Sequence, residues 1–360
     1  MGRSGSPNER TVAFERLGEA MLLAAACAGD ERAFEELISS HRQELHRHCY
    51  RMLGSAHDAD EALQDTLMRA WRGLPGFGGR SSLRTWLYRI ATNASLRVVE
   101  RRPRRVLPVD DGPPADPGAA RWQLVEAGWV EPYPSDRAGV EAGVLGPAAR
   151  YEQSESVELA FVAAFQHLPP NQRAVLLLRD VLGFSAKEAA EVLGTTLASV
   201  NSALQRARRT VRRRLPERSQ RASLRALGDV RVRELVAAYV DAWERGDVAA
   251  ILALLTDDAT FSMPPYAVWF GGRDAIAAFL PRGPLRERWR LVPVRANGQL
   301  AFGCYRWNDD SRLHIAHSLD VLTVAGDRIE HITAFLDAES LARFGLPPEL
   351  PPARDSRSAR

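Results

Sequence analysis

The chain is poor in cysteine and contains no long hydrophobic run. Its three cysteines, Cys27, Cys49 and Cys304, lack the spacing of a zinc site or a redox motif, and an odd number of distant cysteines argues against a disulfide framework. No stretch approaches the roughly 20 apolar residues that cross a membrane. The first residues also lack the apolar core of a secretory signal. We therefore expect a cytoplasmic protein without a metal site or a cofactor.

Lysine is almost absent as well. Lys187 is the single lysine among 48 basic residues, so arginine carries nearly all of the positive charge. Genomic base composition explains most of this preference, although the planar guanidinium group also suits phosphates and base edges. With 45% hydrophobic and 26% charged residues in 360, the chain is not disordered throughout, and its length predicts two or three domains.

The charges are unevenly distributed, although the formal net charge is only +3. Two basic blocks cover 80–105, with eight arginines and one acid, and 206–225, with nine arginines and one acid. Between them, 108–158 holds ten acidic residues, three arginines, seven prolines and six glycines, which predicts an acidic, weakly structured linker. Two basic blocks joined by an acidic tether indicate a protein that binds a polyanion, although a solvated helix face also explains either block alone.

Helical periodicity dominates the first hundred residues. Apolar side chains recur at spacings of three and four through 30–53, and another helix precedes this segment at 17–28. Ser55 is placed to cap the next helix, which runs to Trp71, and Ser82 is placed to cap a helix that ends before Pro103. These features predict an all-helical domain over 17–105.

A second helical segment follows the linker, over 156–220. Residues 185–193 and 197–214 flank a glycine-containing turn in the pattern of a helix-turn-helix. Amide and hydroxyl side chains on the second of these helices can read base edges, and the arginines behind them can hold phosphates. A plain helical hairpin is the alternative. The base-edge candidates are Ser199, Asn201, Ser202 and Gln205, and the phosphate candidates are Arg206, Arg208 and Arg209.

The pattern changes after residue 228. Helical segments at 232–243 and 248–255 precede strand-like runs at 260–263, 289–294, 300–307, 315–324 and 328–335. Helices followed by strands predict an α+β domain over 228–346, with a curved antiparallel sheet. We expect the last segment, 347–360, to be disordered. The fold class is thus multidomain and mostly α, with an α+β tail.

Three ordered blocks resemble the extracytoplasmic-function (ECF) sigma factors of bacterial RNA polymerase. The block DADEALQDTLMRAW at 58–71 resembles their second conserved region, and LRTWLYRIATN at 83–93 resembles the adjoining segment that handles promoter DNA. The block LPPNQRAV at 168–175, with the helix-turn-helix after it, resembles their fourth region. WVEPYP at 129–134 and the chain from 230 onward are similar to the SigG-type subgroup, whose members carry a SnoaL-like domain.

The resemblance implies a domain order. Sigma region 2 would occupy 17–105, the acidic linker 106–155, sigma region 4 156–220, and a cone-shaped SnoaL-like domain 228–346. It also implies that the linker threads toward the active-site channel of the polymerase, where its negative charge would suit a basic tunnel. A simple proline-rich tether is the alternative.

The resemblance further implies that the chain binds core RNA polymerase and directs promoter recognition, DNA melting and transcription initiation. Region 2 would dock on the clamp helices of the β′ subunit and capture the separated minus-ten strands, which needs stacking surfaces and cations in one groove. Region 4 would contact the β flap and the major groove of the minus-35 element, through the candidates named above for the helix-turn-helix.

The residues that carry these roles follow from the matched blocks. The polymerase-binding candidates are Asp58, Asp60, Glu61, Gln64 and Asp65, for which a solvated helix face is the alternative. The minus-ten candidates are Phe77, Arg80, Ser81, Thr85, Trp86, Arg89, Asn93, Arg97 and Arg101, with Arg102 as a further phosphate contact. Trp86 is equally compatible with a core position, and many relatives have Asp where Arg97 stands.

The SnoaL-like resemblance implies an apolar pocket that could hold a small hydrophobic ligand. The candidates to line it are Tyr239, Trp243, Phe261, Met263, Trp269, Phe279, Trp289, Phe302, Tyr305, His317 and Phe335. Asp258, His317 and His331 are the titratable groups expected nearest to it. Aromatic residues at strand spacing are often plain core, and no spacing identifies an acid/base pair, so we do not expect an enzyme.

Two other classes of protein compete with a sigma factor. One is a ligand-responsive helix-turn-helix regulator that works as a dimer, and the other is a SnoaL-like enzyme with a DNA-binding front end. Neither explains all three blocks. We also expect the tail to modulate the activity of the sigma regions, because covalent attachment gives it a high effective concentration.

Overall fold

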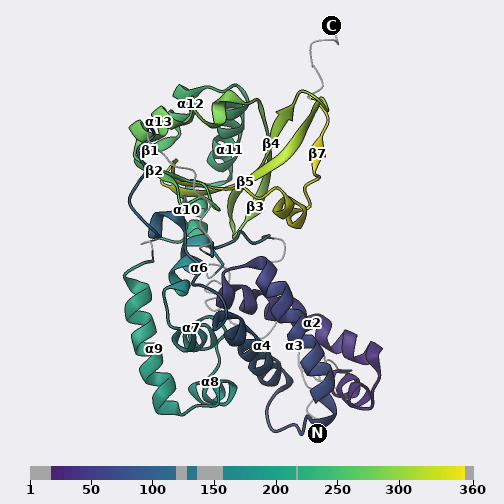
Figure 1. The fold of residues 1–360 in the computed structure, drawn as a ribbon. Coiled ribbons are helices and arrows are strands. Elements are labelled where there is room, and N and C mark those ends of the chain that lie inside the picture. Colours follow the sequence, from purple (N-terminus) through teal and green to yellow (C-terminus); the bar gives the residue numbers. More distant parts are fainter. Residues whose placement is uncertain (1–17, 119–127, 136–156, 216–217, 353–360) are drawn as a thin grey trace, which may run out of the picture. The chain divides into compact units, whose positions relative to one another are not determined.

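The computed structural model describes residues 18–118, 128–135, 157–215 and 218–352 (Figure 1). Its contacts form two compact units: residues 1–102 with 169–209, and residues 103–168 with 210–360. These units cut across the domain boundaries expected from the sequence, because the start of the region 4 segment groups with the tail. No helix in the described ranges is long and apolar enough to cross a membrane.

The first unit begins with the helices predicted for region 2. A helix over 18–27 is followed by α2 (Glu31–Leu53), α3 (Ala56–Gly73), the short η1 (Leu74–Gly76) and α4 (Leu83–Val99). The side chains of Ser55 and Ser82 accept hydrogen bonds from backbone amides in the first turns of α3 and α4, as the sequence predicts. Gly54 ends α2 in the left-handed conformation, with φ 69°. Helices α2, α3 and α4 pack on one another around a common core.

The helix-turn-helix belongs to the same unit, except for the last turn of its second helix. It comprises α7 (Pro170–Leu176), the π-helical turn η3 (Leu177–Val181), α8 (Ala186–Leu193) and α9 (Leu197–Arg212). Ser185 and Glu188 form a capping box at the start of α8, and Gly194 ends this helix with φ 62°. Val192 and Val200 are buried and lie one on each of the paired helices. This confirms the expected helix-turn-helix.

Arginines join the region 2 helices to the region 4 helices within this unit. Helix α4 packs against α7 and α8, and α2 packs against α7. Arg84 of α4 forms an ion pair with Glu44 at 2.5 Å and donates to the carbonyl of Leu182 at 3.3 Å. Arg173 of α7 donates to the carbonyl of Met52, near the end of α2. An arginine of region 2 thus donates to region 4, and an arginine of region 4 donates to region 2.

The second unit contains a bent sheet with α11 (Asp229–Glu244), α12 (Val248–Ala253) and α13 (Arg273–Phe279) gathered on one face (Figure 1). Its strands are β1 (Leu255–Ser262), β2 (Trp269–Gly271), β3 (Trp289–Ala296), β4 (Gln299–Asn308), β5 (Leu313–Ala325), β6 (Arg328–Phe335) and β7 (Glu349–Leu350). The other elements are η2 (Pro108–Asp110), α6 (Leu159–Gln166), α10 (Gln220–Leu227), η4 (Pro284–Arg286) and η5 (Glu339–Phe344). The fold class is as predicted: helical sigma segments and an α+β tail.

The tail differs from the expected one in three ways. The strand order is β2-β1-β6-β5-β4-β3, and β1 pairs with β6 in parallel, so the sheet is mixed rather than purely antiparallel. The helix predicted at 248–255 is shorter because Leu255 already begins β1. Part of the tail expected to be disordered is ordered, since Glu349 and Leu350 pair with β5; residues 353–360 lie outside the described ranges.

Part of the acidic linker is also ordered. Val106 and Trp129 form a β-bridge, and Pro134 forms another with Ala296 of β3. The side chains of Val130 and Tyr133 are fully buried, which removes their apolar surface from water and stabilises this part of the chain. The description of a weakly structured linker is therefore wrong for parts of 106–118 and 128–135. The remaining linker residues, 119–127 and 136–155, lie outside the described ranges.

Candidate functional site

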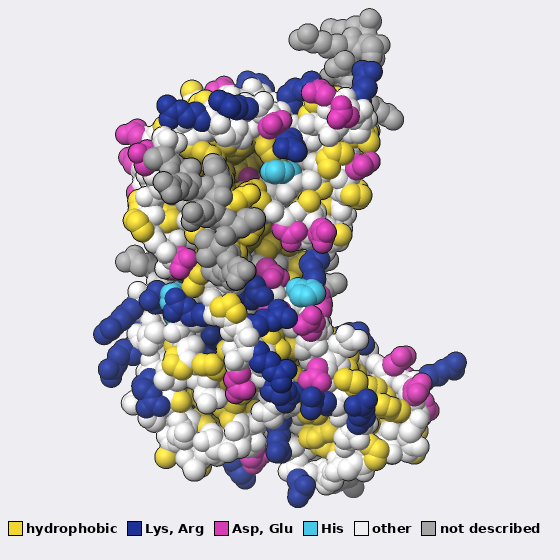
Figure 2. Space-filling view, in the orientation of Figure 1, with side chains coloured by type: hydrophobic (Ala, Val, Ile, Leu, Met, Phe, Trp, Pro, Cys, Tyr) yellow, Lys and Arg dark blue, Asp and Glu magenta, His cyan; other side chains and the backbone are white. Residues whose placement is uncertain are grey.

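The residues expected to capture the minus-ten strands lie before α4, along it and just beyond its end. The rings of Phe77 and Trp86 lie 5.1 Å apart and are half-buried, so each leaves part of its surface accessible. Arg80, Arg89 and Asn93 are exposed, and the last two are one helical turn apart on α4. Figure 2 shows basic side chains gathered over the helical unit. Aromatic, cationic and amide groups are thus accessible before and along α4.

Two of the minus-ten candidates are engaged elsewhere. Thr85 is 4% exposed, and its hydroxyl lies 2.8 Å from that of Ser82, so its side chain belongs to the cap of α4 rather than to an open surface. Arg97 forms an ion pair with Asp65 at 2.9 Å. Ser81 is half-buried and Arg101 is exposed.

The polymerase-binding candidates on α3 differ strongly in exposure. Asp58 is 1% exposed and pairs with Arg102, which places its carboxylate inside the domain. Asp60 is half-buried and lies 2.9 Å from His46. Glu61 and Gln64 are exposed, although Glu61 also approaches Arg102 at 3.3 Å. Only Glu61 and Gln64 of the five candidates are therefore fully accessible to a partner.

Asp65 links the acidic and the basic candidates. Its carboxylate accepts from Arg69 at 2.7 Å and from Arg97 at 2.9 Å. Burial would raise the pKa of Asp65, but the hydrogen bonds and positive charges of these two arginines lower it below the usual range. A polymerase residue that bound Asp65 would therefore compete with arginines of the same chain.

The outward face of α9 carries the base-reading candidates. Ser199, Asn201, Ser202 and Gln205 are all exposed, as are Arg206, Arg208 and Arg209. Buried residues alternate with them at helical spacing; these are Val200, Ala203, Leu204 and Ala207. Arg208 forms two hydrogen bonds with the carboxylate of Asp180, at 2.7 and 2.8 Å, which fixes its guanidinium group against the body of the unit.

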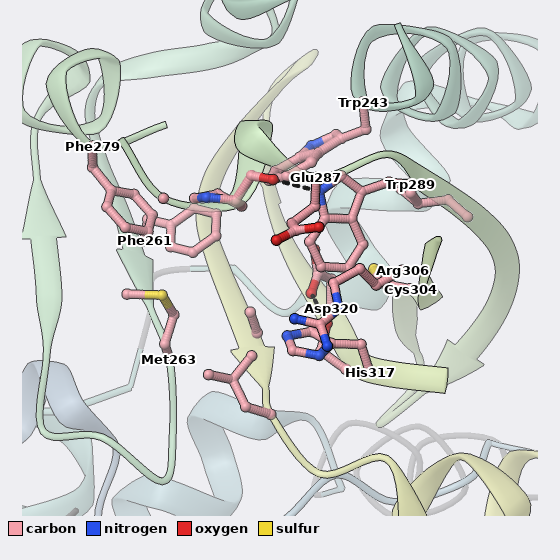
Figure 3. A pocket seen from close by; sticks show the side chains of 16 residues that line it. Trp243, Phe261, Met263, Phe279, Glu287, Trp289, Cys304, Arg306, His317 and Asp320 are labelled. Carbon is pink, nitrogen blue, oxygen red and sulfur yellow. Dashed lines mark hydrogen bonds between the residues drawn. The ribbon is translucent and has the colours of Figure 1, made fainter. Parts of the chain in front are cut away.

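The tail encloses a cavity of about 250 Å³ between its helices and its sheet (Figure 3). Trp243, Met263 and His317 line it as expected, and so do other expected residues, Phe261, Phe279 and Trp289. On the face drawn in Figure 2, hydrophobic side chains also line a hollow in this unit.

The remaining pocket candidates lie elsewhere. Tyr239 and Phe302 are fully buried, with ring centroids 4.6 Å apart, and Tyr305 is fully buried too, so these residues are core. Trp269 instead donates its indole N–H to the carbonyl of Gly112 and lines a separate hollow, together with His331. Asp258 is exposed on β1. Phe335, which is buried, is core as well.

Asp320 is one of several cavity residues that the sequence did not reveal. Its side chain is 4% exposed and lines the cavity from β5. Tyr239 donates to Oδ2 at 3.1 Å and Ser318 donates to Oδ1 at 3.4 Å. Burial raises the pKa of Asp320 to about 6, against the opposing effect of hydrogen bonds from Tyr239, Cys304 and Ser318.

A β-bulge turns His317 toward the same cavity. Cys304 pairs with Ser318 and Tyr305 pairs with Ala316, which leaves His317 without a partner on β4. Two consecutive residues of β5, His317 and Ser318, consequently line the cavity, where strict alternation would allow only one. Burial lowers the pKa of His317, and nearby Arg306 lowers it further while Glu287 raises it. The described residues contain no group of three or more potential metal ligands.

Comparison with known proteins accounts for the whole order of segments. The chain matches family models for sigma-70 region 2 at residues 37–105, sigma-70 region 4 at 158–211 and a SnoaL-like domain at 236–332. It is 43% identical over 327 residues to the ECF RNA polymerase sigma factor SigG of Mycobacterium tuberculosis, which covers 89% of this chain and 86% of that protein. SigM of the same organism is 31% identical over 198 residues, covering 55% of this chain and 84% of SigM.

A solved structure shares the fold. The crystal structure of the Mycobacterium tuberculosis ECF sigma factor SigJ has a TM-score of 0.52 and 21% identity, and covers 87% of this chain and 99% of that chain. The matches to both sigma regions do not favour a helix-turn-helix regulator or a SnoaL-like enzyme. Because the similarity to SigG extends over most of both proteins, the chain belongs to the ECF sigma factors of RNA polymerase, with a SnoaL-like domain after region 4.

Proposed function

We propose that the chain binds core RNA polymerase and directs initiation at promoters that it reads with two separate surfaces. The observation that carries this proposal is the match to both sigma regions, together with the exposure of the expected DNA-facing residues on α9 and around α4. Such a protein initiates transcription and needs no catalytic residue, metal or cofactor of its own.

The minus-ten surface combines a stacking platform with cations. Phe77 and Trp86 present accessible ring surface on which an unstacked base can lie, and Arg80 and Arg89 supply positive charge for the adjoining phosphates. Asn93 adds a donor and an acceptor for a base edge. Thr85 holds the start of α4 in place and supports this surface indirectly.

Docking on the β′ clamp helices is assigned to the exposed part of α3. Glu61 and Gln64 are accessible there, whereas Asp58 is buried. Exposed acids that meet basic partner residues mainly improve the association rate and fix the register of the complex. On the same reasoning, the outward face of α9 reads the minus-35 element while region 4 rests on the β flap.

In-vitro transcription with core polymerase on a promoter library tests this function. The wild-type chain should initiate at a defined set of promoters, and Glu61→Lys should weaken its affinity for the core enzyme. Glu36→Lys, a matched reversal at an exposed acid of α2, should leave that affinity unchanged. Failure of the folded protein to initiate anywhere, or equal losses in both variants, contradicts the proposal.

We also infer that the SnoaL-like domain modulates sigma activity by holding the linker and the start of region 4. Asn297, in the turn between β3 and β4, accepts from the amide of Tyr133 at 2.8 Å and donates to the carbonyl of Val157 at 2.6 Å. Gln299 accepts from the amide of Leu159 at 2.9 Å. The tail thus binds chain on both sides of 136–156, the linker segment outside the described ranges.

A second set of hydrogen bonds joins the beginning of α6 to the beginning of α10. Glu158 accepts from the backbone amides of Gln220 and Arg221, at 2.7 and 2.9 Å. The side chain of Gln220 in turn exchanges hydrogen bonds with the backbone of Val324 on β5. Polymerase binding that required the linker elsewhere would have to break these buried contacts, which gives the tail control over activity.

Two matched variants test this role. Asn297 and Arg312 are non-glycine residues with φ 55°, so glycine fits the backbone at either position. Asn297→Gly should raise hydrogen exchange at 129–135 and change the transcription yield, while Arg312→Gly, at an exposed turn, should change neither. Faster exchange at the linker with unchanged transcription and polymerase affinity contradicts a regulatory role.

A further inference from the structure

The cavity of the tail contains a buried carboxylate without a counter-charge. Asp320 lines it from β5 and is 4% exposed. Its hydrogen-bond partners are neutral groups, namely the hydroxyl groups of Tyr239 and Ser318 and the thiol of Cys304. Among the residues that the structure describes, Asp320 forms no ion pair with Arg, Lys or His. A buried anion that lacks a cation carries a desolvation cost that a positively charged ligand would offset.

The walls of the cavity favour a cation with a hydrophobic body. Trp243 of α11, Phe261 of β1, Phe279 of α13 and Trp289 of β3 surround it with aromatic surface. Figure 3 shows the rings of Phe261 and Phe279 on one side and Asp320 near Trp289 on the other. The faces of aromatic rings carry partial negative charge and attract ammonium groups, most strongly where water is excluded.

The other charged groups lie around His317. Arg306 and Glu287 are exposed residues of the lining, and both influence the pKa of His317. Burial lowers the pKa of His317, so its imidazole is neutral at pH 7. The lining therefore presents two carboxylates against one guanidinium group, and the balance selects against anions.

We propose that this cavity binds a small hydrophobic amine, with its ammonium group donating to Asp320 and its body between the aromatic walls. The volume of about 250 Å³ lies below the usual range of ligand pockets, so the ligand has one or two rings rather than a drug-sized skeleton. This inference goes beyond the proposed function, and its test does not depend on transcription.

Three probes of matched shape and different charge test the proposal on the full-length protein. 1-Naphthylmethylamine, 1-naphthalenemethanol and 1-naphthoate are titrated by calorimetry at pH 7.5. The amine should bind at least about tenfold more tightly than the alcohol, because a charged hydrogen bond and a cation–π contact both favour it. The naphthoate should bind most weakly. Equal or tighter binding of the alcohol or the naphthoate, or no binding of any probe to folded protein, overturns the proposal.

Variants locate the site. Asp320→Asn keeps the shape of the side chain and should abolish the preference for the amine while leaving the alcohol bound, whereas Asp310→Asn, at an exposed carboxylate outside the cavity, should leave the preference intact. An unchanged preference in Asp320→Asn overturns the proposal. Leu336→Trp, which enlarges a partly buried lining residue, should weaken all binding, and it serves as the deciding variant if circular dichroism shows Asp320→Asn to be unfolded.

Discussion

The hydroxyl of Tyr239 donates to Oδ2 of Asp320 at 3.1 Å, which joins α11 to β5 across 81 positions of sequence. Both side chains are buried, so water contributes little to the stability of the carboxylate. The pKa of Asp320 is raised by this burial from 3.8 to about 6. The folded tail therefore holds the proton of Asp320 more tightly than the unfolded chain does, and this difference is measurable as a pH dependence of stability.

Asp320→Asn should stabilise the tail at neutral pH but not at acidic pH. Because the folded pKa lies above the unfolded one, the stability associated with protonated Asp320 is present below about pH 4 and is lost as pH rises through 6. The free energy of unfolding falls by at most about 3 kcal/mol over this range. Asn does not ionise, so the variant keeps this stability. Calorimetric unfolding at pH 4.5 and 7.5 measures the difference, and Asp310→Asn should show none of it. A variant less stable than the wild type by the same amount at both pH values contradicts this prediction.

Asp320 also shows what the sequence could not reveal. It lies in a strand-like run, 315–324, whose alternation predicts the strand correctly, but one sequence does not say which acid on a strand faces a cavity. The bulge at His317 depends on how β4 and β5 pair, so it leaves no local signal. The candidates Tyr239 and Phe302 failed for a related reason, since aromatic residues serve core and pocket equally well.

The ion pair between Arg84 and Glu44 predicts a second stability effect. Burial would raise the pKa of Glu44, but the charge and hydrogen bonds of Arg84 lower it below the usual value. Arg84→Met should lower the free energy of unfolding of the first unit by about 2 to 3 kcal/mol, because it leaves Glu44 buried and unpaired. Arg72→Met, at an exposed position, is the matched control. Urea unfolding at pH 7 measures both.

The pH dependence of stability distinguishes the contribution of this ion pair from the contribution of side-chain packing. A lowered folded pKa stabilises the protein above the unfolded value of 4.5, and that stability is lost as pH falls through the folded pKa. The gap between wild type and Arg84→Met should therefore shrink below pH 4. Hydrogen exchange in α8 should also rise in the variant, since the guanidinium group lies 4.5 Å from the ring of Phe184. A pH-independent gap would assign the loss to packing alone.

Region 4 allows base reading and phosphate binding to be separated. Gln205→Ala should cost about 1 to 3 kcal/mol of discrimination at one base pair and leave the salt dependence unchanged. Arg209→Ala should weaken binding to all sequences and reduce the salt slope by about one. Holoenzyme binding to minus-35 variants across salt concentrations measures both. Loss of affinity without loss of discrimination in Gln205→Ala contradicts its assignment to a base edge.

The helices were predicted well because the interactions that begin and end a helix lie within a few residues of one another. The caps at Ser55 and Ser82 need only hydrogen bonds within one turn, so a single sequence indicates them. The sequence did not predict that part of the linker is ordered. This ordering depends on the hydrogen bond between Tyr133 and Asn297, which lie 164 positions apart in the chain. The sequence also did not predict which acids of α3 are buried, since this depends on the side chains that pack against the helix.

Asp58 and Glu61 provide the sharpest test of the polymerase-binding surface. Asp58 is buried and pairs with Arg102, which is itself partly exposed, so the two ends of this ion pair are not equivalent. Arg102→Ala leaves a buried carboxylate without this partner and should destabilise the first unit by roughly 2 kcal/mol, while Asp58→Asn leaves only an accessible guanidinium group and should cost less. Glu61→Lys should change stability little, because Glu61 is exposed, yet should weaken binding to core polymerase. Affinity measured at equal folded fraction distinguishes the two roles: if Asp58→Asn lowers the affinity of the folded protein as strongly as Glu61→Lys does, Asp58 contacts the polymerase and its burial in the free chain must be relieved on binding.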